Sequence, residues 1–485
     1  MAGSRELNER VAAAPAVRVA RAALADGPAE EAWIVGGTVR DALLERPLTD
    51  LDLAVRGDPE KVARTIARGA GGPVFALSEA FGAWRAMSSD RGWTCDVTAV
   101  HGDGIDADLA RRDFSINAIA LPLEGGEPHD PQGGIPDLEA RALRVLGGPD
   151  VEHSAYADDP LRPLRMARLA TELSLHPTPE TRSLTLAAAP LVANAAAERV
   201  FAELRRIVTS DRVVEGLELC DEVGLTAVVL PELHALHGVE QSHFHHLDVH
   251  DHTIEVLRCY LAVERDPEGV FGELAQPLDE LMSEPFADEL TRWQALRFAA
   301  LLHDCGKPAT RGVRPDGRVT FIGHDKVGAE MIRALFRRLK TSERLRELVA
   351  NVTHHHLVLG FLVHERPLGR DLVYRYLERC QPVEVEVTLL TCADRLATRG
   401  KNAEAAIAAH LELARELMAE ALAWRSSPPE PAVRGRELAE ELGMKPGPEL
   451  GELLARLREA RFTGEAETRE QAVALARRLR QNPSR

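Results

Sequence analysis

Two aspartates spaced two residues apart are the side chains best suited to chemistry in this sequence. Asp50 and Asp52 lie in an apolar run, and residues two apart on a β-strand point to the same face. Leu51, Leu53 and Val55 then point the other way, into a core. Two convergent carboxylates suit Mg²⁺, which takes oxygen ligands and is usually shared with substrate phosphates. The pair therefore predicts a magnesium site on a strand.

A glycine turn precedes this pair along the chain. Gly36 and Gly37 follow the apolar run Ala32–Val35, which we expect to be a strand. Glycine allows a backbone to approach a phosphate closely. Thr38 is expected to cap the short helix that follows and carries Arg40. A DxD pair alone is common at protein surfaces, but the glycine turn beside it favours a functional site.

Further polar residues follow in a second group. Asp96 lies in a strand-like run and is either a third carboxylate beside the first two or an exposed strand residue. Arg111 and Arg112 can grip a triphosphate, because a guanidinium offers fixed donors to phosphate oxygens. Asp113 and Asn117 are placed to orient a sugar or these arginines.

A third group is built from arginines at helical spacing. Arg162, Arg165 and Arg168 share a face if the segment is a helix. Asp158 and Asp159 precede them, so the group offers donors and acceptors enough to read the Watson–Crick edge of one base. The alternative is an ordinary helix start with a solvated run of charge.

The whole chain limits the classes of protein to consider. It has 485 residues and a net charge of -17, which argues against indiscriminate nucleic-acid binding, including DNA. No segment approaches 18 uninterrupted apolar residues and the N-terminus lacks a signal-peptide core, so neither a membrane span nor export is expected. Six cysteines without a CxxC pair fit reduced thiols, and we expect a cytoplasmic protein.

The elements that position these residues fall into five segments. We expect an amphipathic helix over 1–30, an α/β head over 31–137, a helical neck over 138–235, a histidine-rich helical domain over 236–425 and a helical tail over 432–485. Within the head, apolar runs predict strands over residues 33–35, 51–55, 73–77, 94–100 and 116–121.

The motifs together resemble one family over residues 30–225. GGxxRD, DxD, RRDFxxNA and DDxxR occur in the order found in the class II tRNA nucleotidyltransferases and bacterial poly(A) polymerases, where the last motif is EDxxR. That family lies within the DNA polymerase beta-like nucleotidyltransferase superfamily. The resemblance implies an α+β fold, with a small nucleotidyltransferase head followed by mostly helical domains. It implies transfer of CMP and AMP from CTP and ATP to the 3′ end of tRNA.

The same resemblance assigns roles to residues. Asp50 and Asp52 would hold Mg²⁺, with Asp96 as a further acidic residue of the catalytic set. Asp159 and Arg162 would pair with the incoming base, in place of a nucleic-acid template. The complete nucleotide-binding set implied is Gly36, Gly37, Arg40, Arg112, Asp113, Asn117, Asp158, Asp159, Arg162, Arg165 and Arg168.

One segment departs from the usual family pattern. Relatives that add all of CCA usually carry a flexible loop of a dozen or more residues before RRDF, whereas only residues 99–107 stand here. A short loop is a feature of relatives that add only CC. The expected product is therefore CC, although the shared motifs leave CCA, A-only and poly(A) addition open.

Histidine and aspartate clusters fill residues 240–400, at 241–253, 303–304, 324–325, 354–356 and 394. They resemble the HD superfamily of metal-dependent phosphohydrolases, whose H…HD…D pattern is matched by His252, His303, Asp304 and Asp394. His324, with His354 or His355, is a candidate for a second ion. The implied chemistry is hydrolysis of a phosphomonoester or cyclic phosphodiester with Mn²⁺, Ni²⁺, Fe²⁺ or Mg²⁺. A degenerate domain that only supports tRNA is the alternative.

Three functions compete on this sequence. The first is a tRNA 3′-end nucleotidyltransferase with an appended HD domain and a tail that grips the tRNA elbow. The second is a poly(A) polymerase. The third is an HD phosphohydrolase whose head only binds RNA. The intact Asp50 and Asp52 pair and the RRDF motif favour the first two. The oligomeric state is not predicted.

Overall fold

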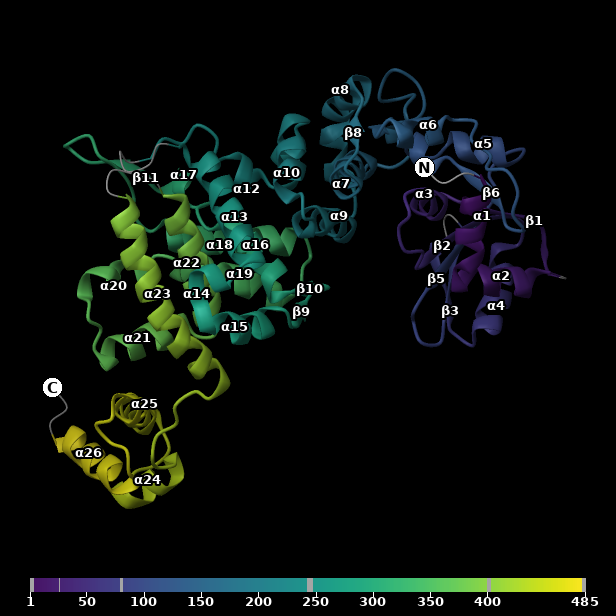
Figure 1. The fold of residues 1–485 in the computed structure, drawn as a ribbon. Coiled ribbons are helices and arrows are strands. Elements are labelled where there is room, and N and C mark those ends of the chain that lie inside the picture. The colour runs from purple at the N-terminus through teal and green to yellow at the C-terminus, as the bar shows by residue number, and fades with distance from the viewer. Residues whose placement is uncertain (1–3, 26, 79–81, 242–246, 399–402, 482–485) are drawn as a thin grey trace. The chain divides into compact units, whose positions relative to one another are not determined.

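The computed structural model describes residues 4–25, 27–78, 82–241, 247–398 and 403–481. The chain divides into two compact units, Met1–Val229 and Leu230–Arg485. The first contains a mixed β-sheet and the second is almost entirely helical, as the ribbon shows (Figure 1). The expected α+β fold is confirmed.

A six-stranded sheet forms the centre of the first unit, in the order β3-β4-β5-β2-β1-β6. Its central neighbours β2 and β5 run parallel, and its other pairs run antiparallel. On β2 the buried residues Leu51, Leu53 and Val55 alternate with Asp50 and Asp52, as the period of two predicted. The strands are β1 (Ala29–Val35), β2 (Asp50–Gly57), β3 (Val74–Ser78), β4 (Ala83–Met87), β5 (Thr94–Ala99) and β6 (Ala120–Pro122).

Two elements of the head differ from the sequence prediction. Strand β4 was not expected, because its sequence AWRAM has no β-branched residue. The run 116–121 was expected to be one strand, but it begins in the 3₁₀ turn η1 (Ser115–Asn117) and only its end joins the sheet as β6. The side chain of Asn117 is held within that turn by Asp113.

The N-terminal segment forms two helices where one was predicted over 1–30. Helix α1 (Ser4–Ala13) ends before Pro15, which begins α2 (Pro15–Leu24). Proline has no backbone N–H and disfavours a helical residue before it, so the first helix stops there. Helix α2 packs on α4 (Pro59–Ala70), which in turn covers β4 and β5.

Helix α4 shows how the sequence fixes such an element. The Asp58 side chain accepts hydrogen bonds from the first backbone N–H groups, and Gly71 ends the helix in a left-handed conformation. The buried residues Val62, Ala63 and Ile66 recur at helical spacing and face the sheet.

Helices make up the remainder of the first unit. Helix α7 packs against α9 and α10 and carries the arginines of the third motif. A short parallel pair, β7 (Ala142–Leu143) and β8 (His176–Pro177), lies beside it. The remaining helices are α3 (Gly37–Leu43), α5 (Ile105–Ala110), α6 (Gly134–Glu139), α7 (Arg162–Leu173), α8 (Pro179–Ala188), α9 (Ala197–Thr209), α10 (Val213–Glu222) and α11 (Leu225–Val229).

Helix α16 (Arg292–Leu302) forms the core of the second unit. A capping box between Thr291 and Gln294 starts it, and it is buried on nearly every side. It packs against α12 (Pro231–His234), α13 (Val249–Arg265), α15 (Ala275–Met282), α19 (Glu343–His355) and α22 (Glu384–Ala397). The unit also contains α14 (Glu268–Phe271), α17 (Lys307–Thr310), α18 (His324–Arg338), α20 (Val358–Leu362), α21 (Arg370–Cys380) and α23 (Ala403–Ser426). Two small hairpins complete it: β9 (Pro285–Ala287) with β10 (Leu290–Thr291), and β11 (Arg311–Val313) with β12 (Val319–Phe321).

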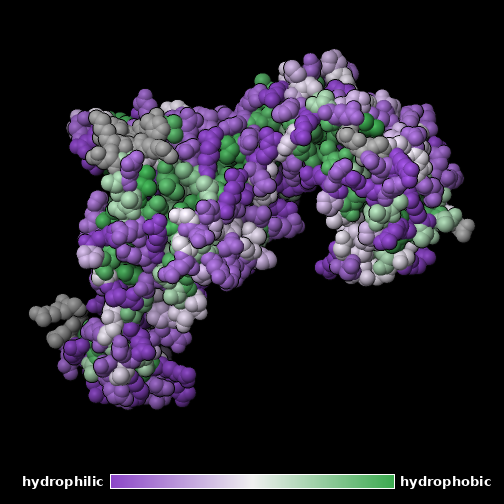
Figure 2. Space-filling view, in the orientation of Figure 1, coloured by the Kyte–Doolittle hydropathy of each residue, from purple (hydrophilic) through white to green (hydrophobic). Residues whose placement is uncertain are grey.

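The tail has a hydrophobic cluster of its own. It consists of α24 (Gly435–Leu442), α25 (Pro448–Thr463) and α26 (Arg469–Gln481), and Leu438 and Leu457 are fully buried among them. Among the described residues, no helix has both the length and the apolar content needed to cross a bilayer. The face shown in Figure 2 is mostly hydrophilic, with apolar residues in scattered patches.

Candidate functional site

The first candidate site lies on the sheet, where β2 and β5 run side by side. Asp50 pairs in register with Thr94, and Asp52 with Asp96, so the three aspartates lie on one face of two adjacent strands. The Thr94 hydroxyl donates to Asp50 Oδ1 at 2.7 Å, and the Gly37 N–H donates to Asp52 Oδ2 at 3.2 Å. The predicted neighbourhood of the three carboxylates is therefore present.

The glycine turn is close to the carboxylates. Gly36 has a φ of 64°, which L side chains rarely adopt. A Cβ at that position would lie 3.2 Å from Asp52 Oδ2 and 3.3 Å from Arg112 Nη1. Glycine is thus required both by the backbone conformation and by the approach of these two side chains.

The cap predicted for Thr38 is wrong. Gly36 is the N-cap of α3, and no side chain caps this helix. The Thr38 hydroxyl instead donates to the Asp50 carbonyl at 3.1 Å and accepts from the Asp52 N–H at 2.8 Å. Thr38 therefore ties the glycine turn to the strand that carries the carboxylates.

Burial raises the pKa of Asp52 to about 6. The Arg112 guanidinium acts in the opposite direction, and the neighbouring Asp96 raises the pKa further. A carboxyl group in such a place favours either a proton or a nearby cation. This environment suits a divalent ion, and Asp50 beside it supplies a second, exposed carboxylate.

Arg112 is held in place by Asp108. Asp108 is 4% exposed and accepts from Arg112 Nη2 at 2.8 Å and from the His101 backbone N–H at 3.2 Å. Asp108 was not among the site residues predicted from the sequence. Its carboxylate joins Arg112 to the connection between β5 and α5, and its spacing of four residues from Arg112 was a usable signal for their pairing.

Asp113 and Asn117 of the RRDFxxNA motif are buried and contact arginines. Asn117 accepts from Arg40 Nη1 at 2.6 Å and donates to Asp113 Oδ1 at 2.9 Å. Asp113 Oδ2 accepts from Arg165 at 3.1 Å. Asp113 and Asn117 were expected to orient a sugar or Arg111 and Arg112, but the arginines that they contact are Arg165 and Arg40.

The start of α7 carries the predicted base-reading group. Arg162 donates to the Ala155 carbonyl at 2.7 Å and to the Arg111 carbonyl at 3.1 Å, while its Nε is buried without a hydrogen-bond partner. Asp159 accepts from Arg199 at 2.6 Å, and Asp158 is exposed beside Arg162. Arg162, Asp158 and Asp159 are therefore grouped as the sequence predicted.

Two arginines of the same motif are paired with glutamates. Arg165 lies 3.3 Å from Glu203, and Arg168 contacts Glu203 and lies 2.8 Å from Glu172. Arg168 is 8% exposed. Nε and Nη1 of Arg168 donate to these two carboxylates inside the protein, and the nucleotide contact of Arg168 stays a prediction. Glu203 was not among the residues predicted from the sequence, because it lies in an ordinary amphipathic helix pattern.

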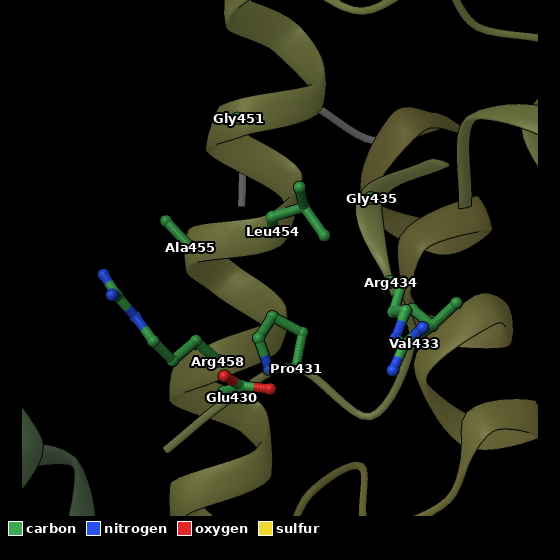
Figure 3. A pocket seen from close by; sticks show the side chains of 9 residues that line it. All are labelled: Glu430, Pro431, Val433, Arg434, Gly435, Gly451, Leu454, Ala455 and Arg458. Carbon is green, nitrogen blue, oxygen red and sulfur yellow. The ribbon is translucent and has the colours of Figure 1, made fainter. Parts of the chain in front are cut away.

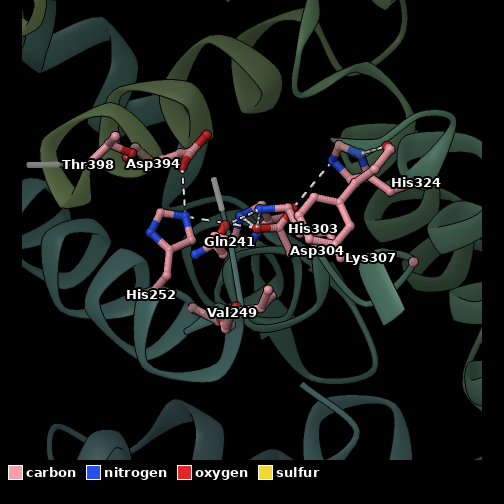
Figure 4. Close-up of polar contacts among 12 residues, drawn as sticks. Gln241, Val249, His252, His303, Asp304, Lys307, His324, Asp394 and Thr398 are labelled. Carbon is pink, nitrogen blue, oxygen red and sulfur yellow. Dashed lines mark hydrogen bonds and ion pairs between the residues drawn. The ribbon is translucent and has the colours of Figure 1, made fainter. Parts of the chain in front are cut away.

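The second candidate site is a histidine and aspartate cluster in the helical unit (Figure 4). It draws side chains from α13, α16, α18, α19 and α22 or from the residues just after them. Within this cluster, two groups of side chains have ligand atoms within 4.8 Å of one another, and Asp304 belongs to both. The groups are His252 with His303 and Asp304, and Asp304 with His324 and His356.

Hydrogen bonds fix the histidine rings. His303, His324 and His356 each have Nδ1 within 3.0 Å of a backbone carbonyl three residues earlier. Nδ1 donates in each case, so Nε2 is left to face the cluster, as in metal-binding histidines. His303 Nε2 is buried and has no hydrogen bond of standard geometry. The donor set therefore fits a divalent metal ion.

Asp304 and Asp394 complete this cluster. Asp394 Oδ1 lies 3.1 Å from His252 Nε2, and Asp304 Oδ2 lies 3.2 Å from His303 Nε2. Burial alone would raise the pKa of Asp304, but the charges of His303 and Lys307 hold it well below its usual range. Burial also acts to raise the pKa of Asp394, but the hydrogen bond and charge of His252 lower it below its usual range, so both carboxylates are ionised and available as ligands.

The structure corrects the choice of histidine for a second ion. His356, and not His354 or His355, lies 3.3 Å from His324 Nε2 and 3.9 Å from Asp304 Oδ1. His354 and His355 contact each other instead, with ring centroids 4.6 Å apart. Successive residues near the end of a helix point in different directions, so only one of three consecutive histidines faces the cluster. Residues 242–246, part of the first histidine cluster in the sequence, lie outside the described residues.

A cavity of about 460 Å³ opens beside the histidine cluster. Lys307 and Arg395 line it with positive charge, and Phe321 and Ile322 line it with apolar surface. Lys307 Nζ lies 2.6 Å from Asp304 Oδ2 and donates to Gln241 at 2.8 Å. Lys307 was not among the site residues predicted from the sequence, although its position three residues after Asp304 was a usable signal.

A second hollow, of about 440 Å³, lies at the tail (Figure 3). Its wall includes Arg434, Arg458 and Glu430 beside small and apolar residues. The lining has no histidine, cysteine or hydroxyl group. It therefore offers no catalytic set comparable to the other two sites.

Family models match three segments of the chain. The Poly A polymerase head domain matches residues 32–100 and 85–144, the probable RNA and SrmB-binding site of polymerase A matches 174–236, and the HD domain matches 249–399. Nucleotidyltransferase heads and HD domains generally depend on metal ions.

Curated relatives match nearly the whole chain. The A-adding tRNA nucleotidyltransferase of Deinococcus radiodurans is 35% identical over 92% of this chain and 95% of its own length. The CC-adding tRNA nucleotidyltransferase of Thermus thermophilus is 36% identical over 92% and 93%. The Multifunctional CCA protein of Xanthomonas campestris is 33% identical over 93% and 99%.

Solved structures share the fold. The Thermotoga maritima CCA-adding enzyme complexed with tRNA aligns with a TM-score of 0.61 over 98% of each chain, at 20% identity. A CCA-adding enzyme in complex with ATP aligns with a TM-score of 0.64 over 99% of this chain and 98% of its own, at 19% identity.

Proposed function

Because this chain belongs to the tRNA nucleotidyltransferase family, with an HD domain after the transferase head, we propose that it adds CMP from CTP to the 3′ end of tRNA without a nucleic-acid template. The observation that carries this proposal is the pair Asp50 and Asp52 on β2, with Asp96 in register beside them and Arg112 at the glycine turn. A head that only bound RNA would need no such set.

The site residues divide the work by position. Asp50 and Asp52 would hold Mg²⁺, which when bound lowers the pKa of the attacking 3′-hydroxyl and neutralises the pyrophosphate leaving group. Arg112, fixed by Asp108, and Arg40, fixed by Asp41 and Asn117, would contact the triphosphate. Because these donors are already oriented, they stabilise charge on the transferring phosphate at little reorganisation cost.

Base selection is assigned to the start of α7. Arg162 has a buried Nε without a hydrogen-bond partner, and Asp159 is held by Arg199. Fixed donors and acceptors discriminate between bases, because a wrong base leaves them unpaired. Asp158 is one methylene shorter than the usual family glutamate, and its exposed carboxylate lies within 3.7 Å of Arg162.

The connection between β5 and α5 supports CC addition rather than full CCA addition. β5 ends at Ala99 and α5 begins at Ile105, so residues 100–104 are all that join them. His101 is tied to Asp108 by its backbone N–H. A short, anchored connection has little reach with which to remodel the base pocket after two additions.

The test is a sequencing-gel assay on tRNA that ends at the discriminator base, with CTP and ATP both present. We expect a dominant product two nucleotides longer. A dominant product three nucleotides longer and ending in A would overturn the CC proposal. A parallel reaction on tRNA ending in CC, with ATP alone, distinguishes an A-adding enzyme from a CC-adding one, because only the A-adding enzyme extends this substrate. Long A tails on any RNA would indicate the poly(A) polymerase alternative.

The histidine cluster favours a second activity in the same chain. We propose that His252, His303, Asp304 and Asp394, with His324 and His356, hold one or two divalent ions that support hydrolysis of a phosphomonoester or cyclic phosphodiester. The buried, carbonyl-fixed rings and the Lys307 and Arg395 lining of the cavity support this proposal. The test is release of phosphate or opening of a cyclic phosphodiester by the chelated protein after Mn²⁺, Ni²⁺, Fe²⁺ or Mg²⁺ is restored singly. Absence of hydrolysis with all four ions would favour a scaffold domain.

We propose that the protein acts in the cytoplasm. Five of the six cysteines are buried and all six are free thiols, which fits a reducing compartment. Its proposed substrate, tRNA, is processed there. Fractionation of cells with an antibody to the chain would test this location.

A further inference from the structure

One side chain beside the transferase carboxylates belongs to none of the GGxxRD, DxD, RRDFxxNA and DDxxR motifs. Arg85 lies on β4, directly opposite Asp96 on β5, and Asp96 lies opposite Asp52 on β2. Arg85, Asp96 and Asp52 thus form a row across three adjacent strands. All three belong to the first unit of the chain.

Arg85 grips both oxygens of Asp96. Its Nε lies 2.6 Å from Oδ1 and its Nη2 lies 2.7 Å from Oδ2, which is the bidentate geometry of a strong guanidinium–carboxylate pair. Asp50 and Asp52 have no such partner among the ion pairs that the structure describes. Among the ion pairs described, Asp96 is therefore held by a bidentate arginine, whereas Asp50 and Asp52 are not.

The chemistry of the ion explains why this difference matters. Mg²⁺ requires near-ideal octahedral geometry and is usually bound by one or two carboxylates together with substrate phosphates. A third carboxylate at the ion would occupy a position that a phosphate oxygen must take. A guanidinium that holds both oxygens of that carboxylate keeps it from turning toward the ion.

We propose that Arg85 is a positioning residue of the transferase site, which withdraws Asp96 from the metal ion and leaves Asp50 and Asp52 as its protein ligands. The proposal rests on the metal site of the proposed function. It differs from an ordinary cross-strand ion pair, which stabilises a sheet without affecting metal binding. Asp96 then tunes the site through Arg85 and is not itself a ligand.

The pKa of Arg85 agrees with this placement. Its hydrogen bond to Asp96 raises the pKa most, and the charges of Asp50 and Asp52 add to the effect. Arg85 therefore responds to all three carboxylates. Arg56, on the same sheet, pairs with Glu31 at 3.6 Å and serves as a matched control.

The experiment measures Mn²⁺ binding to the full chain by calorimetry or electron paramagnetic resonance, without nucleotide or tRNA. Binding that disappears in Asp52→Asn identifies the transferase site and separates it from the HD site. We compare the effect of Arg85→Gln on Mn²⁺ affinity in two backgrounds, one with Asp96 and one with Asp96→Asn. We expect the tightening to be about tenfold larger when Asp96 is present, which is a coupling within the range for contacting residues. Arg56→Gln should stay within about twofold of wild type, because its partner is a distant surface carboxylate.

The conservative variant separates charge from geometry. Arg85→Lys keeps the charge but cannot grip both oxygens, so we expect tightening intermediate between wild type and Arg85→Gln. If Arg85→Gln does not fold, the lysine variant, made with and without the Asp96→Asn substitution, carries the same comparison. Equal tightening in the two backgrounds, or none, would overturn the proposal and leave a sheet-stabilising pair. Failure of Asp52→Asn to remove any Mn²⁺ site would instead refute the proposed metal site itself.

Discussion

The two candidate sites of this chain use carboxylates in opposite settings. In the head, Asp50 is exposed and Asp52 is partly buried on a strand, with arginines as their charged neighbours. In the helical unit, His252, His303 and Asp304 are each no more than 2% exposed. The first site is open toward solvent and the second is enclosed among helices.

The difference indicates how each site would treat its metal ion. The histidine rings are fixed by backbone carbonyls before any ion binds, so that site is prepared to retain a resident ion. The strand carboxylates leave coordination positions free, so that site suits an ion that arrives with a nucleotide. A resident ion needs ligands that are fixed before it binds, whereas an ion shared with a substrate needs coordination positions that the substrate can fill.

The largest expected effect tests whether the strand pair acts in transfer alone. Asp52→Ala should reduce nucleotide transfer by about 10³-fold, on the order of 4 kcal/mol of transition-state stabilisation, because it removes a metal-binding carboxylate. Single-turnover addition to tRNA measures this effect. Hydrolysis by the HD site should be unchanged, and Asp106→Ala, at an exposed position of the same head, is the control. Near-normal transfer in Asp52→Ala would contradict the catalytic assignment.

The next effect tests the independence of the enclosed site. His303→Ala should lower metal-dependent hydrolysis by about 10²-fold or more, because a fixed ligand is lost, while CC addition stays within about twofold. His356→Ala should act in the same direction and His354→Ala should have little effect, since only His356 faces the cluster. Equal losses in both activities would indicate one shared site.

A smaller effect concerns base selection at the open site. Arg162→Ala should reduce the preference for CTP over UTP by about 10-fold to 100-fold, because a fixed donor to the base edge is removed. The KM for the triphosphate should change less than the selectivity. Arg206→Ala, an exposed arginine of α9 paired with Glu172, is the control. A variant that still chose CTP as wild type does would refute the base-reading role.

The smallest effect contrasts the two sites by pH. Burial lowers the pKa of His356 from 6.5 in the unfolded chain to about 4. The stability that the neutral His356 ring contributes is therefore complete above pH 6.5 and is lost as the pH falls toward 4. Between pH 7 and 5.5 the free energy of unfolding of the chelated helical unit should fall by about 1 kcal/mol through this group. The raised pKa of Asp52 has the opposite effect on the free energy of unfolding. The stability that protonated Asp52 contributes is complete below pH 3.8 and is lost as the pH rises to about 6.

Unfolding curves of wild type and His356→Gln at several pH values would measure the first effect. The difference between the two proteins should shrink as the pH falls. A difference that is independent of pH would show that His356 is not held neutral by burial.

Local patterns in the sequence were enough for much of the fold and the open site. The alternation in Asp50–Val55 predicted which side chains face the core, and the structure places Asp96 beside Asp52 as expected. The failures were also local in origin. The apolar periodicity predicted one helix over residues 1–30, but Pro15 divides it into two. The AWRAM sequence of β4 has little strand propensity, although β4 is paired with a strand on both sides.

The enclosed site shows the limit more sharply. The sequence supplied three consecutive histidines and the helix period, but not the rotation of α19 against α18 that turns His356 toward His324. That rotation depends on how the two helices pack, and packing is decided by residues far apart in the chain.

The sequence by itself determined the family, the order of the motifs along the chain and the residue types available for chemistry. Each motif can be identified from residues that lie a few positions apart. Only the tertiary structure decided which of those residues meet. The register that sets Arg85 opposite Asp96 and the contact of Glu203 with Arg168 both join separate elements. Such contacts follow from strand register and helix packing, which no local pattern specifies.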